Sequence, residues 1–201
     1  MTGAIAGPDG KPRCPWGLSA PEYIPYHDEE WGRPVRGDQV IFERLCLEAF
    51  QSGLSWLTIL RKRENFRAAF AGFDVHRVAQ FDDDDRARLM ADTGIVRNRA
   101  KIDAAIANAV ATAAMEDAGE SLADLVWSHA PQREGARGDA DLAAETAESR
   151  ALAKELKRRG FRFVGPTTVY STMQACGVVN DHVPGCCVHD EVERERRSAG
   201  R

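Results

Sequence analysis

Hydrophobic residues recur three and four positions apart over most of this 201-residue chain, which is the period of an α-helix. Glycines, prolines and acidic residues stand at the ends of these periodic stretches, where helices begin and end. The pattern predicts helices within residues 38–52, 63–73, 74–81, 82–94, 98–119, 121–131, 148–160 and 165–177. Only FRFVG, residues 161–165, favours a strand. We therefore expect an all-α fold without an internal repeat.

The same pattern predicts how individual segments end. Asp38 and Asp74 stand where their side chains could cap the helices that follow. The polar segment Gln132–Thr146 interrupts the helical period and is the best candidate for a loop. Residues 1–12 and the charged tail 190–201 lie outside the periodic region, and we expect both to be unstructured. The length of the chain suits one domain or two small lobes.

Composition places the chain among ordinary globular proteins. It is 43% hydrophobic and 29% charged, with a net charge of −4, which suits one buried core and argues against a protein that coats nucleic acid. No apolar run approaches the roughly 18 residues of a membrane helix, and the first residues lack the apolar middle of a signal peptide. We expect a cytoplasmic protein. Five cysteines, an odd number, favour buried, reactive or metal-bound thiols over a disulfide framework.

Cysteines and histidines occur near both ends of the predicted domain. Cys14 and His27 lie in the amino-terminal segment, and HVPGCC places His182 before Cys186 near the carboxyl end. Two sulfurs and two imidazoles are the ligands of a structural zinc site. Spacing leaves alternatives open, because Cys187 could replace Cys186, and His189, two residues further on, is a weaker rival.

The segment LEAFQSGLSW combines a carboxylate, a tight turn and an indole. Glu48 lies on a helix that is apolar nearly all round, so it must be paired or functional unless it is exposed. Gly53 and Leu54 follow in a predicted turn, where a leucine could enter a base stack, and Trp56 lies next to it. Packing between two helices is the more ordinary use of Leu54 and Trp56.

A third stretch, TGIVRNRAKI, follows the predicted end of a helix at Gly94. Arg97, Arg99 and Lys101 lie at the start of the next helix, where cations are unfavourable unless an anion joins them. A turn with exposed amides and three cations suits a phosphate backbone. A solvated basic helix start is the alternative.

Four segments together resemble the DNA-3-methyladenine glycosylase I family, the constitutive alkyladenine glycosylases of bacteria. The resemblance runs in order from about Arg13 to Cys187 and rests on the segments RCPWGLSAPEYIPYHDEEWG, LCLEAFQSGLSWLTILRKRENFRAAF, GIVRNRAKI and KRRGFRFVGPTTVYSTMQACGVVNDHVPGCC. It implies one domain, residues 13–189, with two helical lobes and a helix-hairpin-helix glycosylase fold. In this fold a structural zinc would join the two terminal segments. The zinc ligands it implies are Cys14, His27, His182 and Cys186.

The resemblance also implies a base pocket and a DNA interface. The pocket would be formed between the lobes by Tyr23, Tyr26, Glu48 and Trp56, with Glu48 as the candidate catalytic residue, and the wedge would be Gly53 with Leu54. The expected activity is excision of flipped-out 3-methyladenine from double-stranded alkylated DNA by a monomer. A zinc-stabilised DNA-binding module without turnover is the alternative.

Two features depart from the wider superfamily. Val96 stands where its hairpin has a second glycine, so the cations would carry more of the phosphate binding. The superfamily's catalytic aspartate lies beyond the hairpin, and the named family lacks it. Asp103, Asp117 and Asp124 lie in that region, and the sequence singles out none of them. A zinc hydrolase would need an open metal position, and a thiol redox protein would need a Cys-x-x-Cys motif, which this chain lacks.

Overall fold

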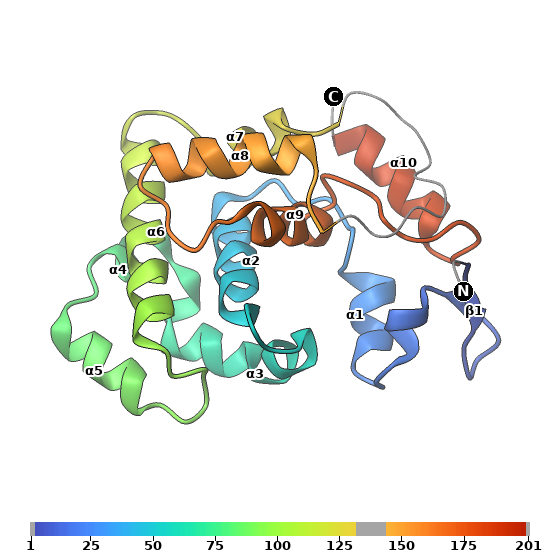
Figure 1. The fold of residues 1–201 in the computed structure, drawn as a ribbon, viewed down its shortest axis with the longest axis horizontal. Coiled ribbons are helices and arrows are strands. Elements are labelled where there is room, and N and C mark those ends of the chain that lie inside the picture. The colour runs from blue at the N-terminus through green and yellow to red at the C-terminus, as the bar shows by residue number, and fades with distance from the viewer. Residues whose placement is uncertain (1–2, 132–143, 200–201) are drawn as a thin grey trace.

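The fold is almost entirely helical, as the computed structural model shows for residues 3–131 and 144–199 (Figure 1). The predicted loop 132–146 lies mostly outside these described residues. The elements in chain order are β1 (Ile5–Ala6), β2 (Pro12–Arg13), η1 (Pro15–Leu18), α1 (Tyr23–Glu29), α2 (Asp38–Gln51), α3 (Trp56–Ala69), η2 (Ala71–Phe73), α4 (Val75–Ala79), α5 (Asp83–Ala91), α6 (Arg99–Asp117), α7 (Leu122–Ser128), α8 (Ala147–Arg158), α9 (Pro166–Ala175) and α10 (His189–Ala199).

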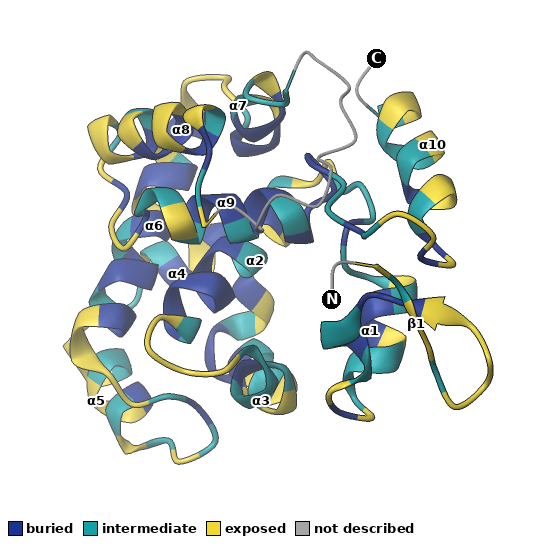
Figure 2. Cartoon of the chain, turned by 45° about the vertical axis from the view of Figure 1, so that its right-hand side comes forward, coloured by how far each residue is buried: buried dark blue, intermediate teal, exposed yellow. Residues whose placement is uncertain are grey.

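Helix α2 lies at the centre of the main hydrophobic core. It packs against α9, α6, α3 and α7, while α4 and α8 cover α6 and α9. Figure 2 shows buried residues concentrated on α2, α6 and α9, and exposed residues on the outer faces of α5, α8 and α10. A helix surrounded in this way must be apolar on nearly every face, which explains the pattern predicted for residues 38–52.

A second, smaller hydrophobic cluster lies where the two ends of the chain meet. It contains Cys14 from the amino-terminal segment and Cys186, Val188 and Val192 from the carboxyl-terminal segment. In Figures 1 and 2 the first residues, α1 and α10 lie on the same side of the molecule, beside the main body. Residues far apart in sequence therefore build one corner of the fold.

Both ends of the described chain are more ordered than the sequence suggested. The leader forms a short antiparallel hairpin, in which Ile5 pairs with Arg13. The charged tail forms α10, and its Val192 is fully buried. Arg33 forms ion pairs with Glu191 at 2.9 Å and with Glu195 at 2.6 Å. The expectation of unstructured ends is wrong here, because local composition does not reveal these long-range partners.

Two local predictions also need correction. Asp38 does not cap α2, which begins after Gly37; its carboxylate instead accepts from Ser121 Oγ at 2.7 Å and from Ala123 N at 2.8 Å, at the start of α7. Residues 161–165 form no strand but a loop between α8 and α9. Asp74 does cap α4, by accepting from Arg77 N at 2.9 Å.

Candidate functional site

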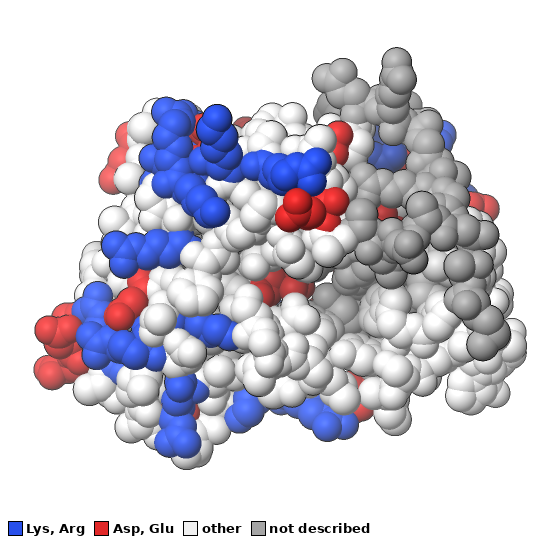
Figure 3. All heavy atoms as spheres, in the orientation of Figure 1, with Lys and Arg blue, Asp and Glu red and all other residues white. Residues whose placement is uncertain are grey.

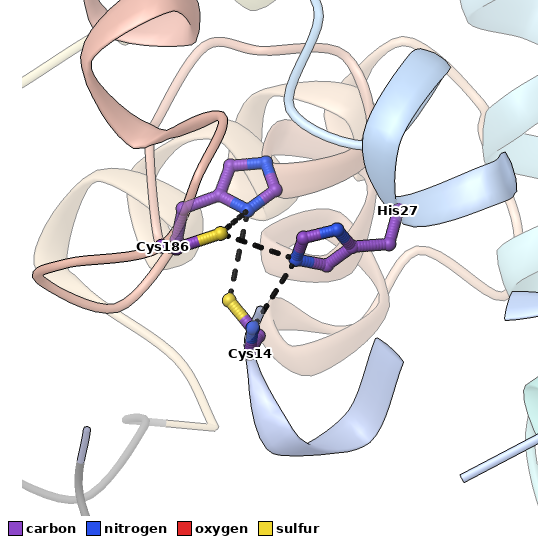
Figure 4. A group of neighbouring side chains, drawn as sticks. Cys14, His27 and Cys186 are labelled. Atoms are coloured by element: carbon purple, nitrogen blue, oxygen red, sulfur yellow. Dashed lines mark hydrogen bonds between the residues drawn. The ribbon is translucent and has the colours of Figure 1, made fainter. Parts of the chain in front are cut away.

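Four buried side chains converge where the two terminal segments meet. The ligand atoms of Cys14, His27, His182 and Cys186 all lie within 4.8 Å of one another. Cys186 Sγ is 3.4 Å from His27 Nε2 and 3.7 Å from His182 Nδ1, and Cys14 Sγ is 3.6 Å from His182 Nδ1. Figure 4 shows the two sulfurs and the imidazole nitrogens pointing toward one another.

The three sulfur–nitrogen separations, 3.4, 3.6 and 3.7 Å, fit a tetrahedral metal ion. Metal bonds of about 2.3 Å to sulfur and about 2.0 Å to nitrogen place tetrahedral ligands about 3.3–3.8 Å apart. Cys187 is exposed and its backbone N donates to Pro12 O at 2.8 Å, so it does not share the buried position of Cys186. His189 pairs with Asp190 at 2.9 Å on the surface and is not part of the cluster. The geometry therefore favours Cys186 and His182 over the alternatives that spacing left open.

Each histidine has an acceptor for its second ring nitrogen, as a metal ligand needs. His27 Nδ1 lies 2.7 Å from Asp28 Oδ1, and His182 Nε2 lies 3.1 Å from Trp31 O. Arg13, which is 1% exposed, donates to both oxygens of Asp28 and holds that carboxylate in place. These supporting residues were not predicted from the sequence, although the adjacent His27 and Asp28 in YHDEEW are the kind of signal that could have indicated them.

Aromatic contacts connect this cluster with the predicted base pocket. The ring of Trp16 lies 5.2 Å from that of His27, 5.6 Å from that of Tyr23 and 6.2 Å from that of Tyr26, in edge-to-face arrangements. Tyr26 and His27 are also neighbours on α1. Trp16, which the sequence analysis did not select, thus packs on both the candidate ligand and the two tyrosines.

Tyr26, Glu48 and Trp56 come together from α1, α2 and the start of α3. The rings of Tyr26 and Trp56 lie 5.5 Å apart at an angle of 40°. Tyr26 is almost fully buried, and burial, followed by the nearby charge of Glu48, raises its pKa well above the usual range. Tyr23 is half-buried and contacts Trp16, so it borders this group.

Two polar groups in this region have no hydrogen-bond partner in the described part of the chain. Trp56 Nε1 is buried without an acceptor. Glu48 is 6% exposed, and none of the hydrogen bonds or ion pairs between described residues involves its carboxyl group. Burial raises the pKa of Glu48 to about 8, although nearby Arg44 lowers it. Because unpaired polar groups are costly to bury, a donor and an acceptor in one place point to a ligand.

The turn between α2 and α3 presents Leu54 to solvent. Leu54 N donates to Gln51 O at 2.7 Å, and Gly53 has a φ of 81°, which fits the third position of a type II turn. Ser55 then caps α3 by accepting from Thr58 N. Leu54 is 42% exposed, so it is not packed between helices, whereas Trp56 is partly buried against the core.

Lys101 does not lie where a phosphate could bind it. It is 8% exposed, and its Nζ donates to Phe50 O at 2.9 Å and to Ser52 O at 2.5 Å. The C-terminal carbonyls of α2 satisfy this cation, and burial lowers its pKa. The prediction that Lys101 is a DNA-binding cation is therefore wrong, because periodicity does not reveal that this face of α6 meets the end of α2.

The other two predicted cations lie near the turn that joins α5 to α6. Arg97 is exposed and forms no ion pair with a described residue. Arg99 Nε lies 3.0 Å from Asp103, whose carboxylate also pairs with Arg86. On the face drawn in Figure 3, Lys and Arg gather over α8 and around α5 and the start of α6. A recessed acidic patch lies near the centre of this face.

Comparisons with known proteins agree on one family. A sequence model described as methyladenine glycosylase matches residues 16–189. The chain is 51% identical over 180 residues to DNA-3-methyladenine glycosylase 1 of Escherichia coli (strain K12), covering 88% of this chain and 96% of that protein. A crystal structure of 3-methyladenine DNA glycosylase I is similar with a TM-score of 0.83 at 52% identity, over 88% of this chain and 99% of the other.

A second solved relative carries information about a ligand. It is 3-methyladenine DNA glycosylase I from Staphylococcus aureus, from a study of the structural basis of its 3-methyladenine recognition. Its TM-score is 0.82 at 34% identity, and the similarity covers 88% of this chain and 96% of that one. The family match covers most of the chain, and sequence and structure agree on it. This protein belongs to the methyladenine glycosylase family.

Proposed function

We propose that this protein is a DNA glycosylase that extrudes 3-methyladenine from alkylated duplex DNA and hydrolyses its glycosidic bond, leaving an abasic site. The observation that carries the proposal is the group formed by Tyr26, Glu48 and Trp56, where two aromatic rings 5.5 Å apart lie beside two polar groups that have no hydrogen-bond partner among the described residues. An enzyme that acts on a base within a duplex must read it in such an enclosure. The names of the relatives, which include 3-methyladenine, support the substrate.

The pocket suits a cationic base. Methylation at the 3 position leaves adenine positively charged, and electron-rich ring faces attract a cation by roughly 0.5–2 kcal/mol per well-placed contact. Tyr26 and Trp56 supply such faces, with Tyr23 at the border. Glu48 can accept from the exocyclic amine, and Trp56 Nε1 can donate to a ring nitrogen. A cation beside Glu48 favours its ionised form, so base and carboxylate would stabilise each other's charge.

Zinc would be held by Cys14, His27, His182 and Cys186, and it would be structural. Four protein ligands leave no open position for water, so zinc supplies a cross-link between the two chain ends and no chemical step. The Asp28 carboxylate orients His27, and Trp16 packs on both His27 and the tyrosines. The metal would thereby fix the wall of the pocket.

DNA binding would use two turns. The connection from α5 to α6 would act as the hairpin. Arg97, which pairs with no described acid, would be its main cation, and Arg99 lies beside it. Its conformation is fixed from α3, because Lys62 Nζ donates to Thr93 O at 3.0 Å and to Gly94 O at 3.1 Å. Leu54, at the tip of the α2–α3 turn, would enter the stack where the base has left.

The chemical step would depend mainly on the charge of the base. A cationic leaving group is already activated, and the protein contributes selection and orientation of the base. Asp103 is not free to act as a base, because Arg86 and Arg99 both pair with it. We expect the enzyme to work as a cytoplasmic monomer; no helix in the described residues is long and apolar enough to cross a membrane.

Release of free base tests the proposal. The full chain is incubated with methylated duplex DNA, and the released bases are separated by chromatography. We expect 3-methyladenine to appear with the parent protein, and at least tenfold more slowly with Glu48→Ala. Glu48→Gln should retain more activity than Glu48→Ala, because one acceptor remains. Tight binding of damaged DNA without any released base would support the alternative, a DNA-binding module without turnover.

A further inference from the structure

A second exposed apolar side chain, Phe163, lies in the loop between α8 and α9. It is 42% exposed and has a φ of 53°, in the left-handed region that a bulky residue avoids. Such strain persists only where the surrounding structure holds it, and strained residues concentrate at binding sites. Phe163 belongs to neither hydrophobic cluster of the described residues, so it is not part of the core.

Asn108 holds the backbone of this loop. It is fully buried in α6; its Oδ1 accepts from Arg162 N at 2.7 Å, and its Nδ2 donates to Arg162 O at 3.1 Å. Both polar groups of the peptide units around Arg162 are thus fixed. The rigid backbone then directs the Phe163 ring to the surface.

Helix α6 also relates Phe163 to Leu54. Lys101, which binds the end of α2 at the Leu54 turn, precedes Asn108 by seven residues on α6. Seven residues are nearly two helical turns, so both side chains leave the same face of α6 about 10 Å apart. In Figure 1 the α8–α9 loop crosses α6, and the α2–α3 turn lies below it. Helix α6 therefore fixes the position of the Phe163 loop relative to the turn that carries Leu54.

The chain around Phe163 is positively charged. Residues 157–170 contain four cations and no acid, in the order KRRGFRFVGPTTVY. Lys157 and Arg162 are exposed, and neither forms an ion pair with another described residue. Two exposed cations that precede an exposed aromatic residue match the chemistry of a nucleic-acid strand, which offers phosphates next to apolar sugars and bases.

We propose that Phe163 is a second DNA-contacting residue of this enzyme, packing against the duplex at the same interface as Leu54 while Arg162 and Lys157 contact neighbouring phosphates. The inference rests on the proposed function in taking DNA as the partner. It adds a contact surface on the α8–α9 loop to the two turns already described.

Binding to a duplex that contains a stable abasic-site analogue tests this role without involving the base pocket. By fluorescence anisotropy with the full chain, Phe163→Ala should raise Kd about tenfold, within the range of one lost aromatic contact to nucleic acid. Phe163→Trp, which keeps a ring, should bind within about twofold of the parent. The control is Val110→Ala, at a residue on α6 that is 50% exposed, and it should leave Kd unchanged.

A glycine variant separates binding from folding. Glycine adopts a positive φ without strain, so Phe163→Gly should unfold at the same temperature as the parent or higher, yet bind the duplex as weakly as Phe163→Ala. Parent-like Kd values for both variants would overturn the proposal, as would an equal loss in Val110→Ala. If the parent binds the duplex but releases no base from methylated DNA, the catalytic proposal fails while the Phe163 contact still stands.

Discussion

Replacing Glu48 by glutamine should stabilise the fold increasingly as pH rises. The folded environment raises the pKa of this carboxyl group from 4.5 to about 8, chiefly through burial. Below pH 4.5 the group is protonated in both states and has no effect. Between pH 4.5 and 8 the unfolded chain loses the proton while the folded chain keeps it, so stability falls by about 1.4 kcal/mol per pH unit.

The size of the effect follows from the interval between the two pKa values. Relative to a group that does not titrate, Glu48 lowers the free energy of unfolding by about 3 kcal/mol at pH 7 and by about 5 kcal/mol at pH 9. Glutamine resembles the protonated carboxyl in shape and does not ionise. The gain from Glu48→Gln should therefore be near zero at pH 4.5 and largest above pH 8.

Urea unfolding followed by circular dichroism at pH 5, 7 and 9 measures this difference. Glu29→Gln, at an exposed position on α1, is the control and should change stability little at any of these values. The same Glu48→Gln protein should excise 3-methyladenine ten- to a hundredfold more slowly, because a charge-assisted hydrogen bond is lost. A stability difference that stays constant from pH 5 to pH 9 would refute the reasoning about burial.

Three further results are expected. Cys14→Ala should lose zinc and several kcal/mol of stability, whereas Cys187→Ala should keep one zinc per chain by metal analysis; full zinc in Cys14→Ala would contradict the ligand set. Arg97→Ala should weaken binding to damaged and undamaged duplex alike and flatten the salt dependence of binding, and an unchanged salt slope would show that Arg97 does not contact DNA. Lys101→Met should mainly lower the unfolding temperature. The parent should excise neutral hypoxanthine very slowly, and rapid release would reveal an unrecognised catalytic acid or base.

The helical architecture could be predicted because it depends on local periodicity. Most predicted segments became helices, and Asp74 capped α4 as its position suggested. Local periodicity could not predict the partner of Asp38, because its carboxylate caps α7, more than 80 residues away in sequence. The order of α10 has the same origin, because Arg33 and the buried surface around Val192 come from elsewhere in the chain.

The candidate metal site shows a different limit. Residue types indicated a four-ligand cluster, but spacing could not choose between Cys186 and Cys187, which differ by one position. The fold distinguishes them by burial, since only Cys186 faces the other ligands. The outer groups, Asp28 and the Trp31 carbonyl, could not be selected from sequence because a carbonyl oxygen carries no residue signature.

Lys101 and Glu48 are both buried, but only Lys101 has hydrogen-bond partners for its charge among the described residues. Lys101 is buried against carbonyl oxygens that satisfy it, so its charge is used inside the fold, at the base of the Leu54 turn. Glu48 is buried beside aromatic rings with no donor from the described residues, so its charge is disfavoured until a cation arrives. Neutral adenine cannot supply that charge, whereas the alkylated base can. On the proposed function, the cost of ionising Glu48 in the free protein would therefore add to the preference for the alkylated base over normal adenine, beyond the attraction of the ring faces.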